Sequence, residues 1–153
     1  MIDDTAIHLA LRNRLLTVSG LPSTDNRAWE NKSFAPTQGT PYLEEEYVPG
    51  PPALLTVPAD TGTLEHRGIY VVRWYGIENA GVTAIRAGVK AILAKFSYGT
   101  RITCTDGQVV RIGTPTGTAS GPTSSQIVPT GDGWAVCTIK VPFWLLTTNA
   151  IAA

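Results

Sequence analysis

The stretch that decides the fold of this chain is EHRGIYVVRWY, residues 65–75. It is rich in β-branched and aromatic residues, which favour strands. Its side chains fall into two alternating sets, which are Ile69, Val71 and Arg73 on one side and Tyr70, Val72 and Trp74 on the other. Successive side chains of a strand point to opposite faces of a sheet. Residues 65–75 are therefore predicted to form the clearest strand in the chain.

Two amphipathic segments predict helices on either side of this strand, at about residues 4–18 and 82–96. The first segment starts at acidic N-cap candidates such as Asp3, and Gly20 stops its pattern. The second carries a broad apolar stripe and ends before Gly99, a natural helix terminator.

The remaining strands are shorter, and turn-forming residues separate them. They are predicted at 42–48, 53–57, 101–105, 108–112, 127–128 and 134–146, the last broken or bulged at Pro142. Runs of strands with two segregated helices predict an α+β fold with a mostly antiparallel sheet. We expect one domain over residues 1–153, with extended loops at about 20–40 and 113–126.

The charge balance excludes one class of function. Twelve Lys and Arg residues face twelve Asp and Glu residues, so the formal net charge is zero. A protein that grips nucleic acid by charge needs a basic surplus. Zero net charge also removes self-repulsion and so favours association. No window approaches the length of a membrane span, and the N-terminus is not signal-like, so a soluble, intracellular-type chain without membrane contact is expected.

Candidate catalytic histidines fail as bases. His8 lies in the first predicted helix among Leu and Ala, and is predicted to be a surface residue of that helix. His66 stands between Glu65 and Arg67, but neighbours on a strand face opposite ways and form no dyad. We therefore assign His66 to a surface or an interface, and no residue to catalysis.

Cofactor and metal sites are also not expected. The chain has no GxSxG, Walker or GxGxxG motif, and its two histidines are not at ligand spacing from either cysteine. Cys104 and Cys137 are predicted to be small buried strand residues. A disulfide between the two cysteines is the alternative if their strands pair. The chain is therefore not predicted to be an enzyme, although a small hydrolase or binding module with an unrecognised site stays an alternative.

The acidic triplet at residues 44–46 invites a metal or acid–base interpretation. On a strand, Glu44 and Glu46 share one face and Glu45 points to the other. A solvated or edge-protecting run of charge is the simpler interpretation.

The loop at 20–40 contains aromatic residues, which disordered segments lack. Trp29 and Phe34 lie within it, and Tyr42 starts the strand that follows. Long irregular segments with such residues are often binding surfaces. Covering the edge of the core is the equally weighted alternative for Trp29 and Tyr42.

The order of these motifs resembles the tail terminator proteins of long-tailed bacteriophages. The matching segments span nearly the whole chain: the helix from Ile7 to Leu16, RAWEN at 27–31, Phe34, Pro36, GTPYL at 39–43, EHRGIY at 65–70, the helix at 82–96, and GW at 133–134 leading into TIKVPF at 138–143. The acidic triplet and the long Thr, Gly and Ser loop depart from the family pattern.

The resemblance implies a virion protein that assembles in the host cytoplasm as a ring, typically a homohexamer, at the head-proximal end of the tail tube. Such a ring stops polymerisation of the tail-tube protein, offers a docking surface to head-completion or connector proteins, and lets genomic DNA pass through its lumen without specific binding. The predicted interface consists of Trp29, Phe34, Tyr42, Arg67 and the loop from Gly113 to Ser125. An ordinary strand-end charge is the alternative for Arg67. Glu44 and Glu46 would line the lumen. Another virion subunit, such as a tail-tube or head–tail adaptor protein, is the alternative.

Overall fold

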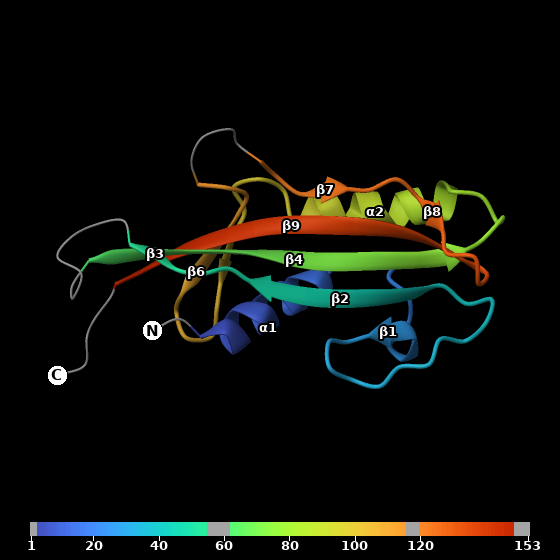
Figure 1. The fold of residues 1–153 in the computed structure, drawn as a ribbon, viewed down its shortest axis with the longest axis horizontal. Coiled ribbons are helices and arrows are strands. Elements are labelled where there is room, and N and C mark those ends of the chain that lie inside the picture. Colours follow the sequence, from blue (N-terminus) through green and yellow to red (C-terminus); the bar gives the residue numbers. More distant parts are fainter. Residues whose placement is uncertain (1–2, 55–61, 116–119, 149–153) are drawn as a thin grey trace.

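The computed structural model describes residues 3–54, 62–115 and 120–148, and shows an α+β fold (Figure 1). The helical elements are α1 (Asp4–Leu15), the 3-10 turn η1 (Thr24–Asn26) and α2 (Thr83–Lys95). The strands are β1 (Arg27–Ala28), β2 (Tyr42–Pro49), β3 (Ala53–Leu54), β4 (Thr63–Ile77), β5 (Arg101–Thr103), β6 (Val109–Ile112), β7 (Thr123–Ser124), β8 (Val128–Pro129) and β9 (Trp134–Thr148). The predicted fold class is confirmed.

One sheet contains all of these strands, in the order β1-β2-β4-β9-β6-β5, with β3 on β4 and with β7 and β8 on β9. Its centre is the antiparallel pair of β4 and β9, whose register runs from Thr63 opposite Thr148 to Ile77 opposite Trp134. The predicted strand at 65–75 is thus the middle of β4. Only β1 is parallel to its neighbour among the described strands.

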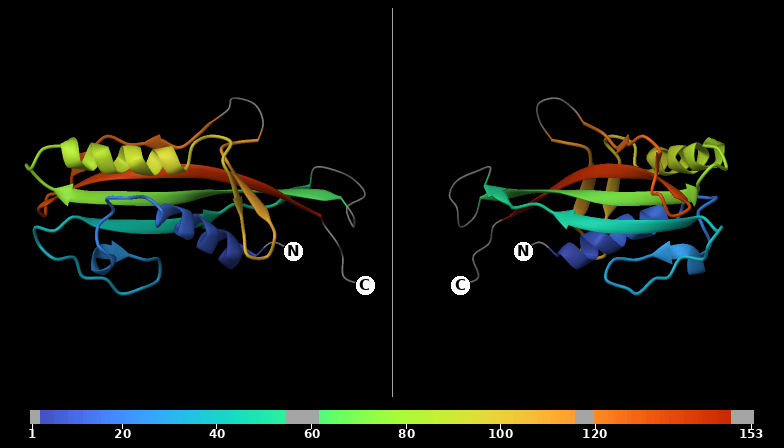
Figure 2. Two further views of the ribbon diagram at one scale, coloured as in Figure 1. Left: turned by 180° about the vertical axis from the view of Figure 1, so that it is seen from behind. Right: turned by 45° about the vertical axis from the view of Figure 1, so that its right-hand side comes forward.

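Both helices cover the same face of the sheet, which we call the inner face (Figures 1 and 2). The core lies between them and the sheet. Its fully buried side chains include Ile7 and Leu11 from α1, Ile92 from α2, and Tyr70 and Ile139 from β4 and β9. None of the described helices lies on the opposite face of β2, β4 and β9, which we call the outer face.

The helix boundaries follow from local hydrogen bonds. The Asp3 side chain accepts hydrogen bonds from the backbone N–H groups of Thr5 and Ala6, at 3.0 and 3.2 Å, so it caps α1 as predicted. The helix ends at Leu15, short of the predicted residue 18. The N–H groups of Thr17 and Val18 bond carbonyls three residues back, which makes the last turn tighter than an α-helix.

The last strand is continuous, so the predicted break or bulge at Pro142 is wrong. Pro142 pairs in register with Ile69, and its carbonyl oxygen accepts the N–H of Gly113. In a strand the N–H and C=O of one residue point to the same side. The missing N–H of Pro142 therefore points toward the end of β6 and not toward β4, so the hydrogen bonds between β4 and β9 are unaffected.

Several boundaries differ from the predicted ranges. The loop at 20–40 contains η1 and β1, the loop at 113–126 contains β7, and the strand predicted at 127–128 is β8. β3 occupies Ala53–Leu54, and the rest of the strand predicted at 53–57 lies outside the described residues.

Both cysteines are buried free thiols. Cys137 lies in β9 as predicted, whereas Cys104 follows the end of β5 and its N–H bonds the carbonyl of Gln108. Burial raises the pKa of the Cys104 thiol to about 11 and also raises that of Cys137.

The packing of α2 on the sheet predicts an unusual effect for Gly88→Ala. Alanine normally stabilises a helix interior by about 1 kcal/mol relative to glycine. Here an added Cβ would lie 2.6 Å from the buried Trp74 ring. We expect the variant to lose about 1–3 kcal/mol in the free energy of unfolding, measured with urea. The exposed control Ala87→Gly reports helix propensity alone, and a gain in stability for Gly88→Ala would contradict this packing.

Candidate subunit interface

A buried carboxylate holds α1 to the sheet. Glu45, in β2, has a fully buried side chain that forms an ion pair with Arg12 of α1. The Tyr70 hydroxyl donates to its Oε2 at 2.5 Å, and His8 Nε2 lies 3.1 Å from its Oε1. Two predictions are thereby corrected. Glu45 is not part of a solvated charge run, and His8 is not on the helix surface, because both turn toward the core.

Aromatic contacts extend this cluster along β2. The His8 ring stacks on Tyr47, with ring centroids 5.0 Å apart and planes 9° from parallel. The Tyr47 hydroxyl donates to Asp4 Oδ1 at 2.7 Å. Burial and this hydrogen bond to a carboxylate both raise the pKa of Tyr47 above its ordinary value. The N-terminal turn of α1 is thus tied to the same strand as Arg12.

Trp29 closes the cluster at the edge of the sheet. The Arg12 guanidinium lies 4.8 Å from the centroid of the Trp29 ring, and the half-buried indole packs on the core. Trp29 therefore covers the core edge. Its predicted part in a subunit interface stays a prediction.

Phe34 and Tyr42 lie elsewhere, at one end of the outer face. The Tyr42 ring stacks on Tyr75, with ring centroids 4.3 Å apart, and packs edge-on against Trp134, with centroids 4.9 Å apart. The centroid of the Phe34 ring lies 5.2 Å from that of Tyr42. Burial, with the neighbouring Tyr75 and Glu44, raises the pKa of Tyr42 to about 12. The part of the loop around Phe34 thus packs at this end of the outer face, and its predicted role as a binding surface stays a prediction.

Glu44 and Glu46 share the outer face, as the strand alternation predicts. Arg73 lies between them on β4 and donates to Glu44 Oε1 and Glu46 Oε2, both at 2.9 Å. Burial disfavours the guanidinium, but these two carboxylates raise the pKa of Arg73 overall. Together Glu44, Glu46 and Arg73 carry one net negative charge, whereas the two carboxylates alone would carry two. Their place in a lumen stays a prediction.

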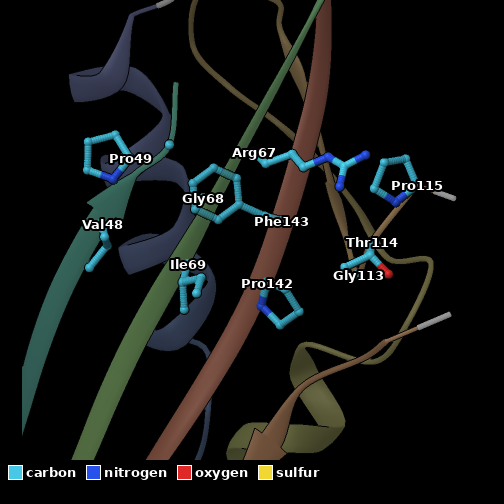
Figure 3. A pocket seen from close by; sticks show the side chains of 11 residues that line it. Val48, Pro49, Arg67, Gly68, Ile69, Gly113, Thr114, Pro115, Pro142 and Phe143 are labelled. Carbon is cyan, nitrogen blue, oxygen red and sulfur yellow. The ribbon is translucent and has the colours of Figure 1, made fainter. Parts of the chain in front are cut away.

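An apolar hollow of about 330 Å³ opens on the outer face (Figure 3). Along β2 it lies beyond Glu44 and Glu46, at the end away from Tyr42. Val48, Ile69 and Pro142 lie opposite one another on β2, β4 and β9 and form an apolar row across three strands. Arg67 lies at the rim with an exposed side chain and is paired with the buried carboxylate of Glu65.

The four predicted interface residues therefore do not form one patch. Trp29 lies beside α1, Phe34 and Tyr42 lie at one end of the outer face, and Arg67 lies beside the hollow. The described part of the long loop contributes Gly113, Thr114 and Pro115 to the hollow, and residues 116–119 lie outside the described residues.

His66 is buried, which corrects the prediction of a surface position. Its Nε2 lies 3.0 Å from the Thr147 hydroxyl across the β4–β9 pair. Loss of hydration lowers the pKa of His66, although the Asp4 carboxylate opposes this shift.

The outward edges of β2 and β9, which bound the long central part of the sheet, are largely covered, and the shorter β1 and β5 are the outermost strands. On the β2 edge, β1 pairs with Leu43 and Glu44, and the Glu30 carboxylate accepts the Tyr47 N–H at 2.6 Å. Pro49, two residues later, has no N–H to offer. On the β9 edge, β8, β7 and β6 pair with segments between Ala135 and Trp144. The central strands therefore offer little template for another strand along these segments.

The family model for phage tail terminator proteins matches residues 6–143. This match covers most of α1, the aromatic loop, Glu45 with its partners Arg12, His8 and Tyr70, and the hollow. The chain belongs to the phage tail terminator family. One solved protein structure superposes with a TM-score of 0.67 at 21% identity, over 95% of this chain and 96% of that one. At this identity the likeness shows the shared fold alone. No curated protein matches the sequence.

Membership defines the broad role of the chain. The family is a structural protein family of phage tails and not an enzyme family, so the chain is a virion component with a tail terminator role. Among the described residues, no helix has the length and apolar composition needed to cross a membrane.

The Glu45 cluster predicts different effects for two neighbouring carboxylates. Glu45→Ala leaves the Arg12 charge against the core without its partner, which should cost about 3–5 kcal/mol in the free energy of unfolding. Glu46→Ala removes a half-exposed partner of Arg73 and should cost about 1 kcal/mol or less. Urea unfolding of both variants measures the difference. Equal losses would show that Glu45 holds no special position.

The lowered pKa of His66 predicts a loss of stability in mild acid. Below the unfolded value of about 6.5, the unfolded chain binds a proton that buried His66 resists, so stability falls as pH falls through this range. Melting temperatures at pH 7.5 and 5.5 should therefore differ more for the wild type than for His66→Gln. An identical pH dependence in the two proteins would contradict the assignment.

Proposed function

We propose that the chain forms a closed ring, expected to be a homohexamer, that caps the head-proximal end of the tail tube. The observation that carries this proposal is the family match over residues 6–143. The ring stops polymerisation of the tail-tube protein and offers its other face to head-completion or connector proteins in the neck.

The covered sheet edges support a finite assembly. A subunit that polymerises by strand addition needs free backbone N–H and C=O groups along an edge. Here β1, the Glu30 carboxylate and Pro49 occupy one edge of the central strands, and β6, β7 and β8 occupy the other. A ring whose subunits meet through side chains can bind the tube end on one face without accepting a further tube layer on the other.

We also propose that Glu44 and Glu46 face the lumen, through which genomic DNA passes. Arg73 binds both carboxylates, so the group repels DNA weakly and offers the phosphates no free cation of its own. Glu44→Lys combined with Glu46→Lys would put three cations side by side and should slow DNA passage and lower infectivity. Unchanged infectivity in a phage that carries both substitutions would contradict the lumen position.

The capping role predicts control of tube length. Purified protein added to polymerising tail-tube protein should give shorter tubes, and fresh tube protein should not extend capped ends because the exposed ring face differs from a tube end. Electron microscopy of tube lengths measures this effect. Heat-denatured protein is the control. Continued elongation would contradict capping, and incorporation along the tube would identify a tube subunit instead.

A further inference from the structure

Two surfaces with exposed apolar side chains lie on opposite sides of the subunit. The first is the hollow on the outer face with its apolar row, where Val48 and Ile69 keep 42% and 39% of their surface exposed. The second lies on α1, which covers the inner face (Figure 2). A surface helix normally turns charged or polar residues to solvent.

We call the second surface the α1 stripe, which consists of Thr5, Leu9, Asn13 and Leu16. All four residues are exposed, and none is charged. They recur at intervals of four, four and three residues, so they line one side of the helix and its C-cap. Leu9 and Leu16 keep 42% and 41% of their surface exposed. The core-facing residues Ile7, Leu11 and Leu15 lie on the other side. Leu9 and Asn13 border a hollow beside Ile102 and Thr103 of β5, but all four residues of the α1 stripe remain exposed.

The two surfaces match in size. Leu9 and Leu16 are seven residues apart, which is about 10 Å along a helix. The apolar row from Val48 to Pro142 crosses three neighbouring strands, which is also about 10 Å at the usual strand spacing. A helix laid across the strands can therefore place one leucine at each end of the row.

Charges of opposite sign lie beside the start of the α1 stripe and beside the hollow. The start of the α1 stripe carries exposed Asp3 and Asp4. Farther along α1, Arg12 is paired with Glu45 and Arg14 donates to the Lys95 carbonyl oxygen. Beside the hollow, Arg67 and Arg111 both lie opposite Trp144 in the sheet register, and the Arg111 guanidinium lies 5.0 Å from the Trp144 ring centroid. Opposite charges at the rim of an interface favour encounter and fix its orientation.

We infer that the α1 stripe of one copy docks in the outer-face hollow of the next copy. Because the two surfaces lie on opposite sides of the subunit, this contact joins different patches of successive copies. Such a heterologous contact closes into a ring when its rotation permits. The inference rests on the proposed ring and assigns the surfaces that build it.

The test uses two variants, each of which disables one surface. Leu9→Glu puts a charge in the middle of the α1 stripe, and Ile69→Glu puts one in the middle of the apolar row. Both positions are exposed, so circular dichroism should show an unchanged fold. Each variant alone should sediment as a 16.3 kDa monomer under conditions where the wild type forms rings. Val82→Glu, at a similarly exposed apolar position outside both surfaces, is the matched control and should still form rings.

Mixing the two variants gives the decisive result. Leu9→Glu keeps an intact hollow and Ile69→Glu keeps an intact α1 stripe, so an equimolar mixture should form a heterodimer of twice the 16.3 kDa subunit mass and nothing larger. Rings formed by either variant alone, a mixture that stays monomeric, or a wild type that is monomeric at every concentration would each overturn the inference. Failure of wild-type rings to shorten tail tubes would instead contradict the capping function and leave the interface standing.

Discussion

The antiparallel register between β4 and β9 is the constraint on which the rest of the structure depends. Its pairs run from Thr63 and Thr148 to Ile77 and Trp134, and each pair fixes which side chains share a face. Tyr70 and Val72 are sent to the inner face under the helices, and Ile69 to the outer face. A slip of one residue would exchange the two sets and would bury Arg73 in place of Trp74.

The same alternation gives Glu45 its role. In register with Val72, it reaches the inner face and meets Arg12 and His8 from α1. A buried ion pair contributes little net stability compared with a well-packed apolar replacement, because both charges lose their hydration. Its effect here is geometric, since only one rotation of α1 brings Arg12 and His8 to Glu45. That rotation also decides which residues of α1 face solvent, so a core contact determines the α1 stripe.

The sequence predicted the elements with strong periodicity and missed what depends on contacts between them. β4, α2 and the 101–112 hairpin were placed to within a few residues, because period and turn chemistry are local. The burial of Glu45 could have been suspected, since alternation put it on the face of Leu43. Its partners could not, because Arg12 and Tyr70 come from distant segments. Pro142 misled the prediction, because the effect of its missing N–H depends on which neighbouring strand that N–H would face.

The predicted interface residues also show that sequence patterns do not reveal which distant segments come together. Trp29, Phe34 and Arg67 were predicted together as interface residues from segments that match the family pattern, yet the fold places them in three separate regions. The hollow depends on Val48, Ile69 and Pro142 coming into register across three strands. No sequence motif marks this row, and only the strand pairing reveals it.

Family membership, the covered edges of the central strands and two unlike exposed surfaces are the basis of our proposal that the subunit assembles with itself to a finite size. The particle mass of the purified wild-type protein over a concentration series, with negative-stain images of the same samples, tests this claim most directly. The account predicts one species of uniform mass, seen as closed rings. Open tubes whose mass grows with concentration would contradict it and would identify a polymerising tube subunit.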